Sequence, residues 1–588
     1  MSLKLLLQLA AATAAAVEVT ATTQADFDYI IIGGGTSGLT VANRLSEDSS
    51  VSVLVIEAGG SVLDNKNVTD VDGYGLAFGT DIDWAYESVN QTYGGNTRKV
   101  LRAGKALAGT SAINGMAYTR AEDIQIDAWE TIGNEGWTWE SLLPYYLKSE
   151  NLTRPTQDQT SKGASYNTDL HGTDGDLKVG FTDIPANNLT ATLNQTMMGL
   201  GVPWTEDVNG GKMRGFNVYP STIDYENYVR EDAARAYYWP FATRENLQVL
   251  NNTFVNRLVW ANGCGDAKAT GVEVTLSNGT IITINTRREV IISAGALKSS
   301  GILELSGVGN PSILQQNNIS VRVNLPAVGE NLQDQANTDL SATSLANVTG
   351  TKTVVYPNIY DIFGNDTESL RQRLSDQLQQ YAADTASANN GVMSATDLES
   401  LYQVQLDLIF TGKAPVAEIL FYPGGGATLA SEYWSLLPFS RGSVHIGASE
   451  PTAMPVINPN YFMLEFDMEV HAAIAQYVRE IFQASPLKDI IQEETLPGQS
   501  VPQAATNEDW KQWILNGNYR SNFHPVGTAA MMPRSIGGVV NEQFQVYGTK
   551  NVRVVDASVL PYQVCGHLTS TLYAISERAA DFIKATSS

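Results

Sequence analysis

The chain has 588 residues, 43% of them hydrophobic and 17% charged, and its formal net charge is -25. That length requires two large domains or one elaborated core, and the composition is that of a globular protein with a sizeable interior. So acidic a surface repels nucleic-acid phosphates and anionic lipid headgroups, so we expect neither nucleic acid nor a membrane as a partner.

The N-terminus predicts a secretory signal peptide over residues 1–16. Lys4 supplies a positive charge, and Leu5 to Ala16 form an apolar run that is too short to span a bilayer. The last three alanines of this run are small enough for a cleavage site. A disordered or helical N-terminal arm is the alternative. No later stretch is long and apolar enough to be a membrane helix.

Asn-X-Ser/Thr sequons agree with secretion, since N-glycans are added to surface loops of secreted proteins. We therefore expect an extracellular protein that carries N-glycans. The ten sequons begin at Asn67, Asn90, Asn151, Asn188, Asn194, Asn251, Asn278, Asn318, Asn347 and Asn365.

The two cysteines do not suggest a disulfide framework. Cys264 falls in a turn rich in Gly and Asn, and Cys565 in an apolar segment, which favours two unpaired thiols, although a pairing between them stays open. Neither a C-x-x-C motif nor a Cys/His cluster is present, so we expect no metal site.

The first predicted elements form a βαβ unit. Residues 28–32 are an apolar run typical of a buried strand, residues 36–45 have helical spacing, and residues 51–56 are a second β-branched run. Such a unit of about thirty residues predicts a parallel sheet.

A glycine motif joins the first strand to the helix. Gly33, Gly35 and Gly38 fit G-x-G-x-x-G, which allows a tight turn and a close approach of the backbone to a pyrophosphate. Glu57 ends the second strand, where it can accept a hydrogen bond from a ribose hydroxyl. The cofactor is then FAD or NAD. We find no second such motif, so if FAD occupies this site the substrate itself must donate the hydride. That predicts an alcohol, a sugar or an amine as substrate.

Later segments return to this pattern and predict one discontinuous cofactor domain. We expect a strand region over 247–260, a hairpin of 271–276 with 280–284, a strand over 289–293 followed by a helix opened by Gly295, a strand over 552–555 and a helix from about 569 to 584. The predicted FAD-binding domain comprises residues 26–150, 226–340 and 525–588.

The remaining segments predict a second domain that covers the cofactor and shapes the substrate pocket. It comprises residues 151–225 and 341–524. Residues 350–410 have helical character, residues 439–446 and 456–462 predict strands of a second sheet, and residues 465–482 predict an amphipathic helix.

The chain has only five histidines. Alcohol oxidation needs a base for the hydroxyl proton, and histidine titrates in the right range. His171 lies in a polar loop, where we expect it to be solvated, and His445 and His471 suit structural roles. His524 and His567 are flanked by Pro, Gly and Cys near the C-terminus, and both catalytic and structural roles stay open for them.

Two long segments identify a family. Gly104–Tyr118 resembles the first signature of the glucose-methanol-choline (GMC) oxidoreductases, with Ala108 where a second glycine is usual. Gly295–Gly309 resembles their second signature, with Ser300 where proline is common. The resemblance covers nearly the whole chain after the signal. It implies an α/β Rossmann-like FAD-binding domain and an α+β substrate domain with a mainly antiparallel sheet flanked by helices.

Within this family the chain is most similar to the fungal FAD-dependent glucose dehydrogenases, and fungal glucose oxidase is similar but more distant. The resemblance implies that the C1 hydroxyl of β-D-glucose is oxidised to glucono-1,5-lactone by hydride transfer to N5 of non-covalent FAD. A quinone-type or artificial acceptor would then take the electrons. A glucose oxidase that uses O₂ and another GMC alcohol oxidase or dehydrogenase stay open. A non-catalytic flavin- or sugar-binding protein is disfavoured because both C-terminal histidines are present.

The resemblance also assigns residues. His524 is the expected general base, and His567 holds the same substrate oxygen. The other expected sugar contacts are Tyr74, Glu432, Arg520 and Asn522. The expected cofactor contacts are Gly33, Gly35, Thr36, Ser37, Gly38, Glu57, Arg102, Gly109, Thr110, Asn114, Gly115, Val255, Asp556 and His567.

Overall fold

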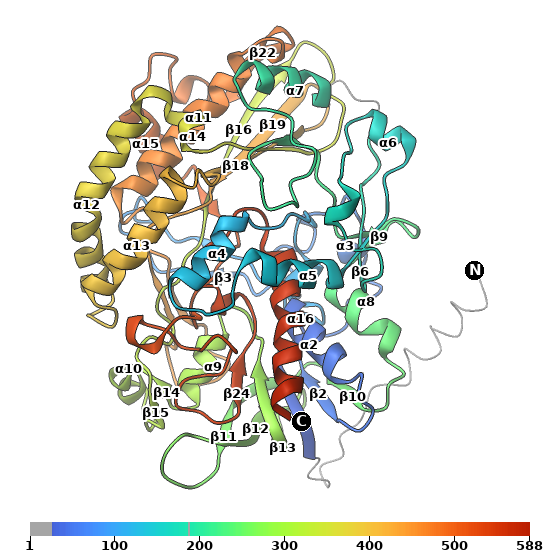
Figure 1. Ribbon diagram of the computed structural model, residues 1–588, viewed down its shortest axis with the longest axis vertical. Coiled ribbons are helices and arrows are strands. Elements are labelled where there is room, and N and C mark those ends of the chain that lie inside the picture. The colour runs from blue at the N-terminus through green and yellow to red at the C-terminus, as the bar shows by residue number, and fades with distance from the viewer. Residues whose placement is uncertain (1–25, 186–188, 588) are drawn as a thin grey trace.

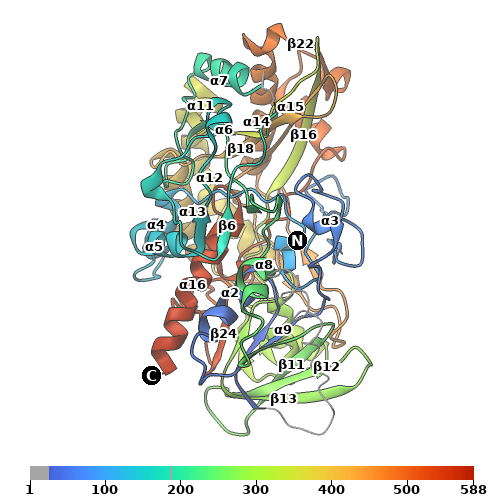
Figure 2. The ribbon, with the colours of Figure 1, turned by 90° about the vertical axis from the view of Figure 1, so that its right-hand side faces the viewer.

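The computed structural model describes residues 26–185 and 189–587. The predicted signal peptide and the sequon at Asn188 lie outside the described residues. Two seven-stranded sheets occupy opposite ends of the molecule (Figures 1 and 2). One continuous hydrophobic cluster includes side chains from both sheets, such as Ile31 and Phe421, so the two parts share a core.

The first sheet contains the predicted βαβ unit. Its strands run in the order β10-β2-β1-β13-β12-β11, and β24 pairs with β13. Each neighbouring pair in the series β10, β2, β1, β13 and β24 is parallel. The strands are β1 (Asp26–Ile32), β2 (Val53–Ile56), β10 (Leu247–Leu250), β11 (Phe254–Trp260), β12 (Ala269–Thr275), β13 (Ile281–Ile292) and β24 (Val552–Val554).

Strand β13 corrects one prediction. The second arm of the predicted hairpin and the predicted strand over 289–293 are a single strand of twelve residues, Ile281–Ile292. Its first half pairs antiparallel with β12. On the same edge of the strand, its last three residues pair parallel with β24. The long strand thereby extends from the outer hairpin into the parallel cofactor core.

The second sheet is antiparallel in every described pair. Its order is β22-β16-β19-β18-β17-β7, and β23 pairs with β16. Helices α11 to α15 lie beside it in Figure 1. The strands are β7 (Gly215–Asn217), β16 (Ala336–Ser344), β17 (Thr353–Tyr356), β18 (Ala417–Pro423), β19 (Thr428–Ser435), β22 (Ile491–Leu496) and β23 (Arg520–Ser521).

The two strands predicted near residues 439–446 and 456–462 do not join that sheet. They form a separate antiparallel pair, β20 with β21, because Ser443 pairs with Asn458 rather than with a strand of the larger sheet. The two-stranded sheets are β3 (Tyr86–Glu87) with β4 (Val100–Leu101), β5 (Glu150–Leu152) with β6 (Leu177–Val179), β8 (Ile223–Asp224) with β9 (Val229–Arg230), β14 (Val308–Gly309) with β15 (Val323–Asn324), and β20 (Ser443–His445) with β21 (Val456–Asn458).

The predicted helices over 36–45, 465–482 and 569–584 are confirmed. The region predicted as helical over 350–410 is helical only from Ile359, because Thr353–Tyr356 forms strand β17 between β18 and β7. Helix α16 packs against α2 and α5. The helices are α2 (Thr36–Leu45), α3 (Lys66–Thr69), α4 (Asp123–Thr131), α5 (Trp139–Ser149), α6 (Gln157–Ser161), α7 (Leu189–Gly199), α8 (Ala233–Tyr237), α9 (Ser299–Leu305), α10 (Pro311–Gln316), α11 (Ile359–Phe363), α12 (Thr367–Ala388), α13 (Ala395–Phe410), α14 (Glu465–Gln483), α15 (Asn507–Leu515) and α16 (Leu568–Ser587). Among the described helices, none combines the length and the apolar character needed to cross a membrane.

The predicted architecture is confirmed: a discontinuous Rossmann-like unit and a second unit built on an antiparallel sheet. The boundaries assigned to the two domains stay a prediction.

The two cysteines have different surroundings. Cys264 is exposed, whereas Cys565 is buried and its thiol donates to the Pro415 carbonyl over 3.3 Å.

Candidate active site

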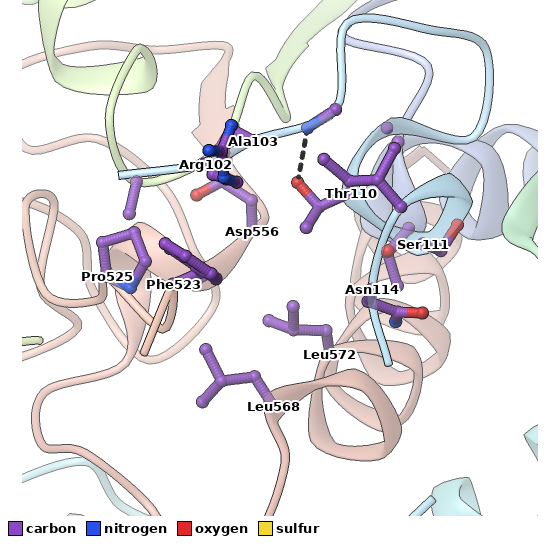
Figure 3. A pocket seen from close by; sticks show the side chains of 18 of the residues that line it. Arg102, Ala103, Thr110, Ser111, Asn114, Phe523, Pro525, Asp556, Leu568 and Leu572 are labelled. Atoms are coloured by element: carbon purple, nitrogen blue, oxygen red, sulfur yellow. Dashed lines mark hydrogen bonds between the residues drawn. The ribbon is translucent and has the colours of Figure 1, made fainter. Parts of the chain in front are cut away.

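A pocket lies where the two sheets face each other. It is lined by the loop after β1, by residues 102–117, by the chain around residues 293–298, by the start of α16 and by strands of the second sheet. Figure 3 shows Arg102, Phe523 and Asp556 on one side of it and Thr110 and Asn114 on the other. All predicted site residues except Gly38 and Arg520 line this pocket.

The glycine motif has the geometry that a dinucleotide requires. A Cβ on Gly38 would lie 2.0 Å from the Gly33 carbonyl oxygen, so only glycine allows α2 to begin this close to β1. A Cβ on Gly109 would lie 2.7 Å from the Cα atom of Gly35, so the loop of the first signature presses against the glycine turn. The N-terminus of α2 faces the space that remains and attracts a phosphate.

Polar groups without a protein partner line the same end of the pocket. The hydroxyls of Ser37 and Ser293 are buried, and neither has a hydrogen-bond partner among the described residues. Both Glu57 oxygens accept backbone N–H groups, from Gly34 at 2.8 Å and from Gly59 at 2.7 Å. Burial raises the pKa of Glu57 to about 7. Because unpaired buried hydroxyls are costly, these residues fit an oxygen-rich ligand such as the expected dinucleotide.

Other predicted cofactor residues are already engaged by the protein. Asp556 accepts from the Gly295 N–H at 2.9 Å and from the Ser299 hydroxyl, and its other oxygen accepts from Ser558. Its carboxylate therefore organises the loop before α9, and a cofactor contact is left to its backbone. Arg102 pairs with Asp83, which fixes the guanidinium at the pocket wall.

The first signature supplies a polar side of the pocket. The Asn114 side-chain oxygen accepts from Arg230 at 2.7 Å, and its amide nitrogen donates to Thr569 at 3.3 Å. Thr110 accepts the Gly104 N–H at 3.1 Å (Figure 3). Thr36, Gly115 and Val255 line the pocket as predicted.

His524 is held in one tautomer. Its Nδ1 atom lies 2.8 Å from the Gln335 side-chain oxygen, and the Gln335 amide nitrogen donates to the Leu436 carbonyl at 3.1 Å, which fixes the orientation of the amide. An amide oxygen only accepts, so Nδ1 of the neutral ring carries the proton and Nε2 keeps its lone pair. The Asn522 amide nitrogen also lies close, 3.0 Å from Nδ1 and 3.4 Å from the Gln335 oxygen, and the second contact is the one compatible with this tautomer.

Burial lowers the pKa of His524 well below its usual 6.5, and the neighbouring His567 and Arg520 lower it further. The imidazole is therefore a neutral base over the physiological range. A group of this kind can take a proton from a substrate hydroxyl, provided that the hydroxyl reaches Nε2.

His567 faces His524 across the pocket, with 5.4 Å between the ring centroids and the rings nearly perpendicular. Its Nε2 atom lies 2.9 Å from an oxygen of Glu418, a fully buried residue of β18. The two groups are in close contact without an aligned hydrogen bond, since neither atom has a hydrogen-bond partner among the described residues. The indole of Trp434 packs edge to face against both imidazoles. Its ring centroid lies 6.2 Å from that of His524 and 5.5 Å from that of His567.

The remaining predicted sugar contacts lie beside this pair. Glu432 accepts from Arg520 at 2.6 Å, and Asn522 accepts from Asn337 at 2.8 Å. Tyr74 lies at the mouth of the pocket with 40% of its surface exposed, and its ring meets Phe78 edge-on. Carboxylate, guanidinium and amide groups together suit a ligand with several hydroxyls.

The structure corrects the prediction for His171. This residue is buried, not solvated, and its two ring nitrogens lie 2.7 Å from Glu150 and 2.8 Å from Asp207. These carboxylates raise its pKa to about 9 despite burial. His445 is held similarly by two glutamates, and the ring nitrogens of the buried His471 lie 2.9 Å from the Thr338 hydroxyl and 3.0 Å from the Ser435 hydroxyl. These contacts agree with the structural roles expected for both residues.

Three residues that contact the histidine pair were not predicted from the sequence: Gln335, Glu418 and Trp434. Glu418 and Trp434 stand opposite each other on β18 and β19, inside apolar strands. A glutamate within an apolar strand is an unusual residue for a core, and that pattern could have identified Glu418. For Gln335, whose partner is 189 residues away, no local signal exists.

Comparisons with known proteins agree with this geometry. Models of the N- and C-terminal parts of the GMC oxidoreductases match residues 27–337 and 438–576. The chain is 44% identical to the glucose oxidase-like protein fsoC of Humicola fuscoatra over 95% of each chain. It is 35% identical to a glucose oxidase of Penicillium chrysogenum, over 95% of this chain and 92% of that one.

Solved structures share the fold over nearly the whole chain. An FAD-dependent oxidoreductase from Chaetomium thermophilum superposes with a TM-score of 0.87 at 26% identity, covering 96% of this chain and all of that one. A fungal aryl-alcohol oxidase superposes with a TM-score of 0.85, also at 26% identity and with the same coverage.

Proposed function

The chain belongs to the GMC oxidoreductase family, and on that premise we propose that it oxidises the C1 hydroxyl of β-D-glucose to glucono-1,5-lactone. Members of this family bind FAD and act on CH–OH donors, so the chain is an FAD-dependent oxidoreductase. We further propose that the enzyme is a glucose dehydrogenase, which passes the electrons to a quinone-type or artificial acceptor.

One arrangement carries the proposal. A neutral His524 with a free Nε2 lines the same pocket as Glu432 and Asn522, which present an acceptor and an amide, and Arg520 pairs with Glu432 from outside the lining. An alkyl or aryl alcohol offers a single hydroxyl and cannot use the donors and acceptors that these groups still present beside their protein partners, whereas a sugar can pair with several of them.

The chain's own residues supply the proton chemistry. His524 takes the C1 hydroxyl proton at Nε2, and Gln335 holds the Nδ1 proton meanwhile. Glu418 lies against His567, 2.9 Å from its Nε2 atom, and His567 holds the same substrate oxygen. Bound FAD supplies the hydride acceptor, and Ser37, Glu57 and the N-terminus of α2 would hold its dinucleotide part. The start of α16, which lines the pocket, favours negative charge there.

Anaerobic addition of glucose to the flavin-loaded protein tests the substrate. We expect the oxidised flavin absorbance to bleach, and the His524→Ala variant to bleach far more slowly. Bleaching by another sugar or alcohol but not by glucose would retain the family chemistry and reject glucose. An unchanged rate in His524→Ala would reject the base assignment.

The alternative is an oxidase that passes electrons to O₂, and the names of the relatives support it. Hydrogen peroxide formed per glucose oxidised in air separates the two. A ratio near one indicates an oxidase, and a small ratio together with rapid dye reduction indicates a dehydrogenase.

We also propose that the protein is extracellular and N-glycosylated. Among the sequon asparagines that the structure describes, five are exposed and open to a glycan: Asn90, Asn278, Asn318, Asn347 and Asn365. Treating the secreted protein with an N-glycosidase should lower its apparent mass, and an unchanged mass would reject glycosylation.

A further inference from the structure

Residue positions on the strands of the second sheet give distances along the pocket. On its inner face, Glu418 pairs with Trp434, Leu420 pairs with Glu432, and Tyr422 pairs with Ala430. Side chains two residues apart on a strand share a face, so these pairs form three successive rows about 7 Å apart. The first row contacts the histidines, and the second holds the predicted sugar-binding carboxylate.

A third row carries a cation. Strand β17 pairs with β18 through Thr353 opposite Phe421, so the preceding residue, Lys352, continues the ladder beside Tyr422. Lys352 lines the pocket, with its Nζ atom 5.4 Å from the Tyr74 ring centroid and 5.8 Å from that of Tyr422. Two aromatic rings thus hold the ammonium group at the outer end of the pocket.

Among the described residues, this ammonium group has no carboxylate or carbonyl in direct contact, and Glu432 and Asp72 act on it only through longer-range charge interactions. Among the described cations that line the pocket, Arg102 pairs with Asp83, and Lys298 donates to the carbonyls of Pro451 and Ala453. Lys352 makes neither an ion pair nor a hydrogen bond within the described residues. Its three N–H donors are therefore available to a ligand.

The row spacing indicates which part of a ligand reaches Lys352. A pyranose ring with C1 at His524 reaches across one row, to Glu432, because ring and hydroxyls together span about one spacing of 7 Å. Lys352 stands one row further out. Tyr74 beside it is 40% exposed, so an aromatic face is open to the apolar side of a second ring.

We propose that Lys352, Tyr74 and Tyr422 form an outer subsite that binds a second sugar ring, linked through the hydroxyl of the oxidised glucose furthest from C1. The substrate class it selects is reducing disaccharides such as maltose and cellobiose. Lys352 is the specificity-determining residue of this subsite. The inference rests on the proposed oxidation of glucose at C1.

The test compares kcat/KM for maltose and cellobiose with that for glucose, using one electron acceptor. In Lys352→Met, which keeps the length of the side chain and removes the charge, the disaccharide-to-glucose ratio should fall about tenfold, the loss of one hydrogen bond from a charged donor. The loss should lie in KM. Lys352→Arg, the matched control, should keep the ratio within about threefold of the wild type.

Flavin content and thermal midpoint establish that each variant is folded and loaded. A wild-type enzyme that oxidises glucose but neither oxidises the disaccharides nor is inhibited by them would overturn the subsite. An unchanged ratio in Lys352→Met would do the same. Absence of glucose oxidation in the wild type would instead reject the proposed function, so the two failures are distinguishable.

Discussion

The side-chain oxygen of Gln335 lies 2.8 Å from Nδ1 of His524, which leaves the other ring nitrogen, Nε2, as the proposed base. The amide oxygen fixes the tautomer, because it can accept a hydrogen bond and cannot donate one. Gln335 is thus a positioning residue for the base.

Replacing Gln335 by Leu should slow flavin reduction by glucose on the order of 10- to 100-fold, since both tautomers become accessible and the base loses its orientation. Gln335→Glu should restore much of the rate and move the acid limb of the pH profile upward, because a carboxylate raises the pKa of the imidazole. Anaerobic stopped-flow measurements across weakly acid pH check both. Equal, pH-independent losses in the two variants would indicate a purely structural role.

Glu418→Gln should slow flavin reduction about tenfold with little change in KM, because it removes the negative charge 2.9 Å from His567 while keeping the side-chain shape. The matched control is Glu122→Gln, another buried glutamate, which binds the Met213 N–H and touches neither histidine. Steady-state kinetics of both variants measure the difference. Equal losses would show that burial of any uncharged glutamine, rather than charge at His567, is responsible.

His171 should make stability depend on alkaline pH. Its folded pKa of about 9 lies above the ordinary 6.5, so its contribution is complete below about pH 6.5 and is lost as the pH rises through about 9. His171→Gln should cost about 3 kcal/mol at neutral pH, since it leaves Glu150 and Asp207 without their shared cation. Thermal midpoints of both proteins should converge near pH 10, and a constant gap would contradict the assignment.

Glu57→Gln should weaken FAD retention by about 10- to 100-fold in Kd, because the amide places a donor against the N–H groups of Gly34 or Gly59 and distorts the turn. Reconstitution of the apoprotein, followed by flavin fluorescence, measures this. An unaltered affinity would mean that the glycine turn alone holds the dinucleotide.

The flavin should be released completely by acid precipitation. The pocket lining from Arg102 to Ala117, which includes most of the first signature, contains no histidine to which the ring could attach. The absorbance of supernatant and pellet reports the distribution, and yellow colour retained in the pellet would indicate a covalent bond.

The sequence by itself determined the features that depend on neighbouring residues. Short apolar and β-branched runs, helical spacing and the glycines from Gly33 to Gly38 predicted the βαβ unit, because those preferences act over a few residues. The scarcity of histidine drew attention to His524 and His567. Family signatures supplied their roles and those of Glu432 and Arg520.

Only the tertiary structure decided which side chains from distant segments lie opposite one another. Strand register places Glu418 at His567 and Lys352 beside Tyr422, and a shift of one residue would turn those side chains to the other face. The same holds for His171. Its polar loop predicted exposure to solvent, whereas in the folded chain Glu150 and Asp207 contact both of its ring nitrogens. Such pairings depend on contacts between segments distant in sequence, and no local pattern contains them.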